Sequence, residues 1–207
     1  MLEYLWAGGP VMVPIGLCSI VAVATFLERL WTLRADRVAP QSFVVELTEL
    51  IRHRRWDDAI TLCRKRPVAV ARVVEVALEV RSEPRSVVKE RVEEVGRREA
   101  AEMERYIPVL GTVASIAPLL GLLGTVGGMI LTFQVIEQQG VKDVADLAGG
   151  ISQALITTFA GLSVGIPALV ANRYLLARVD SMLLELEEIA LAVVQLLDEA
   201  RAGEEVT

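Results

Sequence analysis

The chain has 207 residues, of which 53% are hydrophobic and 23% are charged, with a formal net charge of −6. Its mean hydropathy of +0.47 is high for a soluble domain and indicates a membrane protein. The only cysteines are Cys18, in an apolar stretch, and Cys63, in a polar region. Two cysteines so placed exclude a secreted disulfide scaffold, and we expect both to be free thiols.

Three stretches lack Asp, Glu, Lys, Arg and His, and they cover residues 4–27, 106–136 and 147–172. A helical span of the bilayer needs about 20 apolar residues, and each stretch exceeds that length. We therefore expect an all-α membrane protein with three transmembrane helices. The alternative for the first stretch is a secretory signal peptide. Since no basic residue precedes it and no small-residue cleavage pattern follows it, we expect a retained span.

The basic residues outside the spans predict the orientation. Residues 1–3 contain none, 28–105 contain seventeen, 137–146 contain one and 173–207 contain three. Because the basic side stays in the cytoplasm, we expect an external N-terminus and external loop 137–146, with 28–105 and the tail 173–207 in the cytoplasm. Fifteen acidic residues nearly balance the seventeen basic ones in 28–105, which favours a solvated surface over a nucleic-acid or lipid-headgroup site.

Within 28–105, apolar residues recur every three or four positions, and this spacing predicts amphipathic helices. Pro40, Pro67 and Pro84 separate these helices, because proline is tolerated in a first helical turn and breaks a helix interior. We therefore expect a small cytoplasmic helical bundle.

Two longer helices are also predicted. No proline follows Pro84 until Pro108, so we expect one helix from Pro84 to Ile136, about 80 Å long, with a large part of it standing in the cytoplasm. The third span is expected to continue through an apolar stripe as far as Leu197, with its glutamates facing water.

Enzyme chemistry has little support in the sequence. The single histidine, His53, lies in Arg52-His53-Arg54-Arg55, which suits a solvated surface better than a metal site or a general base. The sequence has no phosphate-binding glycine loop with its lysine. We therefore expect no catalysis, no cofactor and no metal.

Glycines within the spans predict close helix packing. Gly124 and Gly128 in the second span, and Gly161 and Gly165 in the third, place small residues four apart. Such pairs let helix backbones approach closely in lipid. This spacing is common in membrane helices, so it has little functional specificity.

Two threonines in the spans are better candidates for function. Thr125 lies eleven residues before Ile136, and Thr158 lies eleven residues after Leu147. Because the two helices are antiparallel, both hydroxyls are expected about 16 Å below the outer boundary. The alternative is that each hydroxyl only bonds a carbonyl of its own helix, and the sequence leaves both open. Thr157, rotated by about 100° from Thr158, is expected to face another surface, such as an adjacent subunit.

The sequence resembles the ExbB and TolQ branch of the MotA/TolQ/ExbB family of membrane motor subunits. The likeness covers essentially the whole chain, including the number of spans and the large cytoplasmic region. Glu28-Arg29-Leu30 after the first span also fits the family pattern. The other motifs that carry it are Gly8-Gly9-Pro10-Val11-Met12-Val13-Pro14, Pro118-Leu119-Leu120-Gly121-Leu122-Leu123-Gly124-Thr125-Val126, and Ala154-Leu155-Ile156-Thr157-Thr158-Phe159-Ala160-Gly161-Leu162 with Ile166-Pro167-Ala168.

The resemblance implies a homopentamer in the bacterial inner membrane, with a periplasmic N-terminus and loop and a cytoplasmic C-terminus. It implies that spans two and three line a pore around an ExbD- or TolR-like single-span partner, and that proton flow drives a TonB- or TolA-like protein. Thr125 and Thr158 match the pore threonines of the family. Many members have a glutamate where this chain has Gln153, at the pore mouth.

The residues themselves lead to a compatible mechanism. Proton conduction needs groups that bind and release protons within the membrane, and these spans contain no acidic, basic or histidine side chain. The proton carrier would then be a carboxylate of a partner, namely an intramembrane Asp of the ExbD- or TolR-like helix. The alternative is a non-conducting membrane scaffold that recruits partners through its cytoplasmic helices. The sequence does not determine whether the conducted ion is H⁺ or Na⁺. It also does not determine whether the task is nutrient uptake, envelope maintenance or motility.

Overall fold

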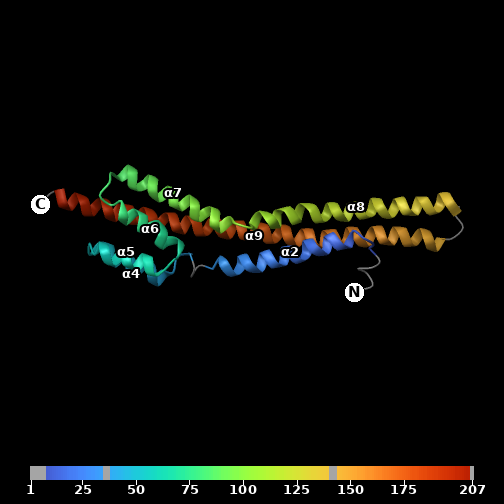
Figure 1. Ribbon diagram of the computed structural model, residues 1–207, viewed down its shortest axis with the longest axis horizontal. Helices are drawn as coiled ribbons and strands as arrows, with labels where there is room; N and C mark the ends of the chain where they lie inside the picture. The colour runs from blue at the N-terminus through green and yellow to red at the C-terminus, as the bar shows by residue number, and fades with distance from the viewer. Residues whose placement is uncertain (1–7, 35–37, 140–143, 206–207) are drawn as a thin grey trace. The chain divides into compact units, whose positions relative to one another are not determined.

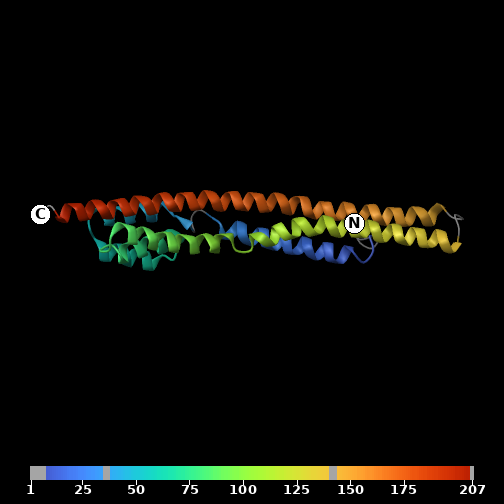
Figure 2. The same cartoon turned by 90° about the horizontal axis from the view of Figure 1, so that it is seen from above.

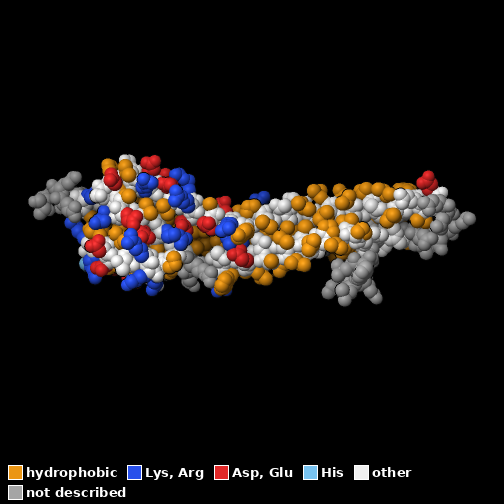
Figure 3. All heavy atoms as spheres, in the orientation of Figure 1, with side chains coloured by type: hydrophobic (Ala, Val, Ile, Leu, Met, Phe, Trp, Pro, Cys, Tyr) orange, Lys and Arg blue, Asp and Glu red, His pale blue; other side chains and the backbone are white. Residues whose placement is uncertain are grey.

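The computed structural model describes residues 8–34, 38–139 and 144–205. The chain forms two compact units, one from Met1–Arg29 with Tyr106–Leu175 and the other from Leu30–Arg105 with Leu176–Thr207. We call the first the apolar unit and the second the charged unit, because nearly all charged side chains in Figure 3 gather on the second. In the described residues all regular structure is helical (Figure 1), which confirms the all-α fold.

The apolar unit contains the helices that could cross a membrane. They are α2 (Met12–Thr32), α8 (Ile107–Gln139) and the first part of α9 (Val144–Glu205). Helical ranges of 21, 31 and 54 residues in these three helices each contain a stretch that is long and apolar enough to span a bilayer, which confirms the three expected spans. Helix α2 begins later than the predicted 4–27, and the beginning of that range lies outside the described residues.

In both ribbon views α8 and the first part of α9 lie side by side and antiparallel (Figures 1 and 2). The face of α8 toward α9 repeats every three or four residues, as a helix with one packed face requires. This face consists of small or apolar residues and ends in one threonine; its buried members are Ile107, Leu110, Val113, Ala117, Gly121, Gly124, Gly128 and Thr132.

The prediction of a single helix from Pro84 to Ile136 is wrong. The structure has α7 over Arg85–Glu104 and α8 from Ile107, with Tyr106 in the left-handed region at φ 67°. Pro108 supplies the physical reason, because in a continuous helix its ring would clash with the carbonyl of Glu104, four residues earlier, and its nitrogen could donate no hydrogen bond. The proline therefore lies in the first turn of a new helix instead of inside a long one.

The charged unit contains the expected bundle, formed by α4 (Gln41–Arg52), α5 (Trp56–Lys65), α6 (Ala69–Glu79) and α7. Prolines mark the helix starts as predicted: Pro40 caps α4 and Pro84 caps α7. The turn between α4 and α5 was not predictable from prolines, since it is made by Arg54 at φ 57°.

Apolar side chains fill the centre of this bundle, and one partly buried ion pair joins α6 to α7. The Arg72 Nε donates to Glu99 Oε1 over 2.5 Å, and a second nitrogen of Arg72 bonds the other oxygen. The Glu99 side chain is only 9% exposed, whereas that of Arg72 is 47% exposed. These hydrogen bonds raise the pKa of the Arg72 guanidinium. The most deeply buried core side chains are Phe43, Leu47, Ile51, Val70, Val73, Val74 and Leu78.

The predicted continuation of the third span to Leu197 is confirmed, because α9 runs without interruption from Val144 to Glu205. Its part in the charged unit buries an apolar stripe at helical spacing and exposes its glutamates. The buried members of this stripe are Val179, Met182, Leu186, Ala190, Val193, Val194 and Leu197.

Candidate functional site

Glycines bring the backbones of α8 and α9 into direct contact in the apolar unit. A Cβ built on Gly161 would lie 2.5 Å from the carbonyl oxygen of Ala117 and 2.9 Å from the Cα of Gly121. A Cβ on Gly121 would lie 3.1 Å from the Cα of Thr158. A Cβ at Gly161 cannot be accommodated without moving a backbone, so this position requires glycine, and the contact at Gly121 is also tight.

The glycines singled out in the sequence lie along the same contact. A Cβ on Gly124 would lie 2.4 Å from the Thr157 Oγ1, and one on Gly128 would lie 2.9 Å from the carbonyl oxygen of Gly150. A Cβ on Gly165 would meet the Pro118 ring at 2.6 Å. Together these contacts define an antiparallel register in which Gly124 lies opposite Thr157.

This register places Thr125 and Thr158 at nearly the same level. Each follows a contact residue by one position, Thr125 after Gly124 and Thr158 after Thr157, so each is rotated by about 100° from the contact. Because the helices are antiparallel, the two rotations bring both threonines to the same side of the helix pair. Both side chains are half-buried, so a third helix on that side would contact both.

The hydroxyls of these two threonines have different partners. The Thr158 Oγ1 donates across the helix pair to the carbonyl oxygen of Gly121 over 3.3 Å. The Thr125 Oγ1 donates to the Leu122 carbonyl of its own helix over 2.6 Å. In a single copy, therefore, the Thr125 hydroxyl bonds within its own helix, which is the alternative that the sequence left open. The Thr158 hydroxyl instead connects the two helices.

Thr157 faces another surface than Thr158, as expected, but that surface is α8 of the same chain and not an adjacent subunit. Thr157 is completely buried and packs against Gly124 of α8 in the same chain. Its hydroxyl donates to the carbonyl oxygens of Gln153, at 3.1 Å, and Ala154, at 2.8 Å, within α9. The buried face of α9 therefore contains Thr157 and Gly161, and Thr158 lies at its edge.

Gln153 contacts the turn that precedes α2. Gly9 has φ 71°, and a Cβ on it would lie 2.1 Å from the Gln153 Nε2. The left-handed backbone conformation at Gly9 favours glycine, and a side chain there would displace the amide of Gln153. Gln153 is half-buried and carries no titratable group, so it acts in this structure as a packing partner of the Gly8-Gly9 turn.

Two further polar contacts of the apolar unit were missed from the sequence. Asn172 Nδ2 donates to the carbonyl oxygen of Ile107 over 3.0 Å and so ties α9 to the start of α8. The guanidinium of Arg29, in α2, lies 5.2 Å from the ring centroid of Tyr106 and also bonds Glu28. Gly111 lies beside the first contact, because a Cβ built on it would lie 3.5 Å from the Asn172 Nδ2.

The outward faces of the apolar unit suit a lipid or protein environment. Large apolar side chains are exposed along α2, α8 and α9, and Val13, Leu119, Leu155 and Phe159 are each more than 60% exposed. A single copy would present these side chains to its surroundings, which in water would be highly unfavourable.

Metal binding and thiol chemistry have no geometric support in the described residues. These contain no group of three or more His, Cys, Asp or Glu placed to hold a metal ion, and His53 is exposed on the surface of the charged unit. Cys18 and Cys63 are free thiols, as expected. Burial, with the nearby Glu75 carboxylate, raises the pKa of the Cys63 thiol to about 12, so this thiol is unreactive near neutral pH.

Three long apolar helices, two of them joined by glycine contacts, define a multi-span membrane protein. Comparison with known sequences identifies its family. The sequence model of the MotA/TolQ/ExbB proton channel family matches residues 65–188, and this chain belongs to that family.

Two relatives named for biopolymer transport are similar over most of the chain, and one named for the Tol-Pal system is similar over less than half of it. An ExbB-like biopolymer transport protein of Synechocystis sp. is 34% identical over 185 residues, covering 86% of this chain and 71% of the relative. A biopolymer transport protein ExbB homolog of Methanothermobacter thermautotrophicus is 31% identical over 189 residues, or 90% of this chain and 67% of the relative. The Tol-Pal system protein TolQ of Haemophilus influenzae is 39% identical over 85 residues, or 41% of this chain and 37% of the relative.

Proposed function

We propose that this chain is an ExbB/TolQ-like subunit of an inner-membrane motor driven by the proton motive force. Its task is to energise transport or an envelope process through a TonB- or TolA-like protein. Family membership supports the class of protein, and relatives named for biopolymer transport and the Tol-Pal system support the type of motor. The observation that carries the proposal is the pair Thr125 and Thr158, at one level and on one side of a helix pair held together by glycine contacts.

The chain requires a partner to conduct protons. A threonine hydroxyl orients and relays hydrogen bonds but holds no charge at physiological pH, and residues 4–27, 106–136 and 147–172 contain no acidic, basic or histidine side chain. A titratable carboxylate beside Thr125 and Thr158 would supply the missing group. An ExbD- or TolR-like single-span protein with an intramembrane Asp has the required chemistry.

The assembly is a homo-oligomer, and on family grounds a pentamer, in the bacterial inner membrane. Exposed apolar side chains on α2, α8 and α9 would be covered by neighbouring copies, by the partner helix and by lipid. The N-terminus and the loop 137–146 face the periplasm, and the C-terminus is cytoplasmic, because basic residues concentrate in 28–105.

Reconstitution in liposomes tests this proposal. We expect no proton flux from the purified chain alone, and flux when the single-span partner with its Asp is included. A partner whose Asp is replaced by Asn should assemble and conduct nothing. Equal flux with and without the partner would contradict the assignment of the proton carrier.

The second candidate is a non-conducting scaffold, which the Thr125 hydroxyl favours because it bonds Leu122 of its own helix. In that case the threonines only pack, and the charged unit recruits other proteins. Liposomes containing the complete complex would then show no proton flux under any applied gradient.

A further inference from the structure

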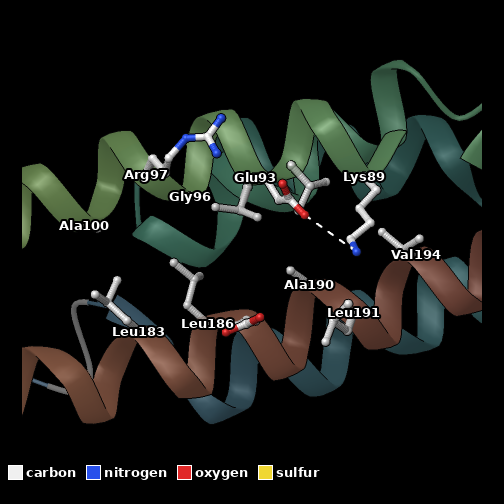
Figure 4. Close-up of a pocket in the computed structure, with 13 residues that line it drawn as sticks. Lys89, Glu93, Gly96, Arg97, Ala100, Leu183, Leu186, Ala190, Leu191 and Val194 are labelled. Carbon is white, nitrogen blue, oxygen red and sulfur yellow. Dashed lines mark ion pairs between the residues drawn. The ribbon is translucent and has the colours of Figure 1, made fainter. Parts of the chain in front are cut away.

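The charged unit contains an apolar groove between α7 and the second part of α9. Figure 4 shows Gly96 and Ala100 of α7 on one wall and Leu183, Leu186 and Ala190 of α9 on the other. The groove has a volume of about 450 Å³. Lys89 and Glu93 pair with each other on its rim at 3.7 Å.

Gly96 marks a part of the groove that none of the described residues fills. No heavy atom of these residues lies within 4 Å of a Cβ built on it. Glycine in the interior of a helix is less stable than alanine, and no contact among the described residues requires its small size. Beside it on the rim is Arg97, whose exposed guanidinium forms no ion pair with any residue that the structure describes.

The same chain presents a complementary surface, which we call the α9 stripe. It consists of Asp180, Leu184 and Glu188, which lie four residues apart on one face of α9 and do not line the groove, whereas Glu187 and Leu191 do. Leu184 is 62% exposed. The carboxylates of Asp180 and Glu188 form no ion pair within the described part of the chain. Leucine between carboxylates is the chemistry that an apolar groove with a free arginine on its rim would bind.

We infer that the groove of one copy receives the α9 stripe of the next copy, with Leu184 over Gly96 and Glu188 opposite Arg97. Groove and stripe are different surfaces, so the contact is head-to-tail and generates a ring when the rotation closes. Leu184 supplies apolar surface for the groove, and charge complementarity sets its register. The inference rests on the homo-oligomer of the proposed function and names its contact in the charged unit.

Heterotypic disulfide cross-linking in membranes tests the contact. Two copies with different tags are expressed together, Gly96→Cys in one and Leu184→Cys in the other, with Cys18 and Cys63 replaced by alanine in both. Oxidation should yield a covalent dimer carrying both tags, which only a contact between copies can produce. Val45→Cys replaces Leu184→Cys in the control, because Val45 is equally exposed, at 65%, and lies on α4 outside the stripe.

Charge reversal provides a second test. Arg97→Glu, in the copy that carries the groove, should lower the cross-linked fraction about two- to fivefold for one exposed ion pair. Glu188→Arg in the other copy should restore it. Cross-linking no stronger than the Val45 control, no rescue by the double reversal, or a covalent product with a different protein would each overturn the inference.

The outcome is separable from that of the motor proposal. A ring seen by native mass spectrometry without the Gly96–Leu184 product would refute this contact and leave the motor proposal standing. A strong Gly96–Leu184 product in complexes that conduct no protons would support this contact and contradict the motor proposal.

Discussion

Replacing Gly161 with alanine should separate α8 from α9. The new Cβ would lie 2.5 Å from the Ala117 carbonyl oxygen and 2.9 Å from the Gly121 Cα, both backbone atoms. Restoring ordinary contact requires the helices to move apart by about 1 Å, because neither backbone atom can rotate away. The bond from the Thr158 Oγ1 to the Gly121 carbonyl, already 3.3 Å long, would then exceed hydrogen-bonding distance.

The magnitude is obtained against a matched control. Gly127→Ala makes the same chemical change in α8, where no heavy atom lies within 4 Å of the new Cβ. Both variants gain the helix propensity of alanine, about 1 kcal/mol, so their difference isolates the steric term. We expect Gly161→Ala to be less stable than Gly127→Ala by about 1–3 kcal/mol.

Unfolding of the purified protein by SDS in mixed micelles, followed by circular dichroism, measures this difference. Gly16→Ala in α2, also without a neighbour within 4 Å, is a second control in case another copy covers Gly127. Equal unfolding free energies for Gly161→Ala and both controls would refute the close contact between α8 and α9.

Three further predictions concern the charged unit and the topology. Glu99→Gln leaves the half-exposed Arg72 without its buried partner and should lower the free energy of unfolding by about 1–2 kcal/mol; an unchanged midpoint in chemical denaturation would contradict this. The Cys63 thiol should resist maleimide at pH 8 and react after unfolding, because its pKa of about 12 keeps it protonated. Since folding raises this pKa, stability should fall as the pH rises above 9.0, the ordinary thiol value. A cysteine replacing Lys142 should be labelled from outside intact cells and one replacing Trp56 should not; the reverse pattern would overturn the orientation.

The sequence predicted those parts of the fold that depend on local composition. Long uncharged stretches identified the three spans, and Pro40 and Pro84 correctly marked the starts of α4 and α7. Both missed helix ends occur at non-glycine residues in the left-handed conformation, Arg54 and Tyr106. Tertiary contacts hold such residues in place, and for Tyr106 one is the Arg29 guanidinium against its ring.

The candidate site was predictable in its residue types but not in its partners. Glycine spacing indicated a close-packed helix pair, and antiparallel counting placed Thr125 and Thr158 at one depth. Which of two adjacent threonines is buried depends on the rotation of α9 about its axis, and packing with α8 sets this rotation. The contact of Gln153 with Gly9 joins residues distant in sequence, and no local pattern encodes it.

The most direct test of the account compares three valine substitutions in the reconstituted complex with its single-span partner. Valine keeps the shape of threonine and removes the hydroxyl. Thr157→Val is the matched control, because this buried hydroxyl bonds only carbonyls of its own helix, and its proton flux should match the wild type. Thr125→Val and Thr158→Val should assemble normally and lose flux about tenfold or more, as expected when a hydrogen bond to a charged group is removed. Wild-type flux in both assembled variants would contradict the proton pathway proposed for this protein.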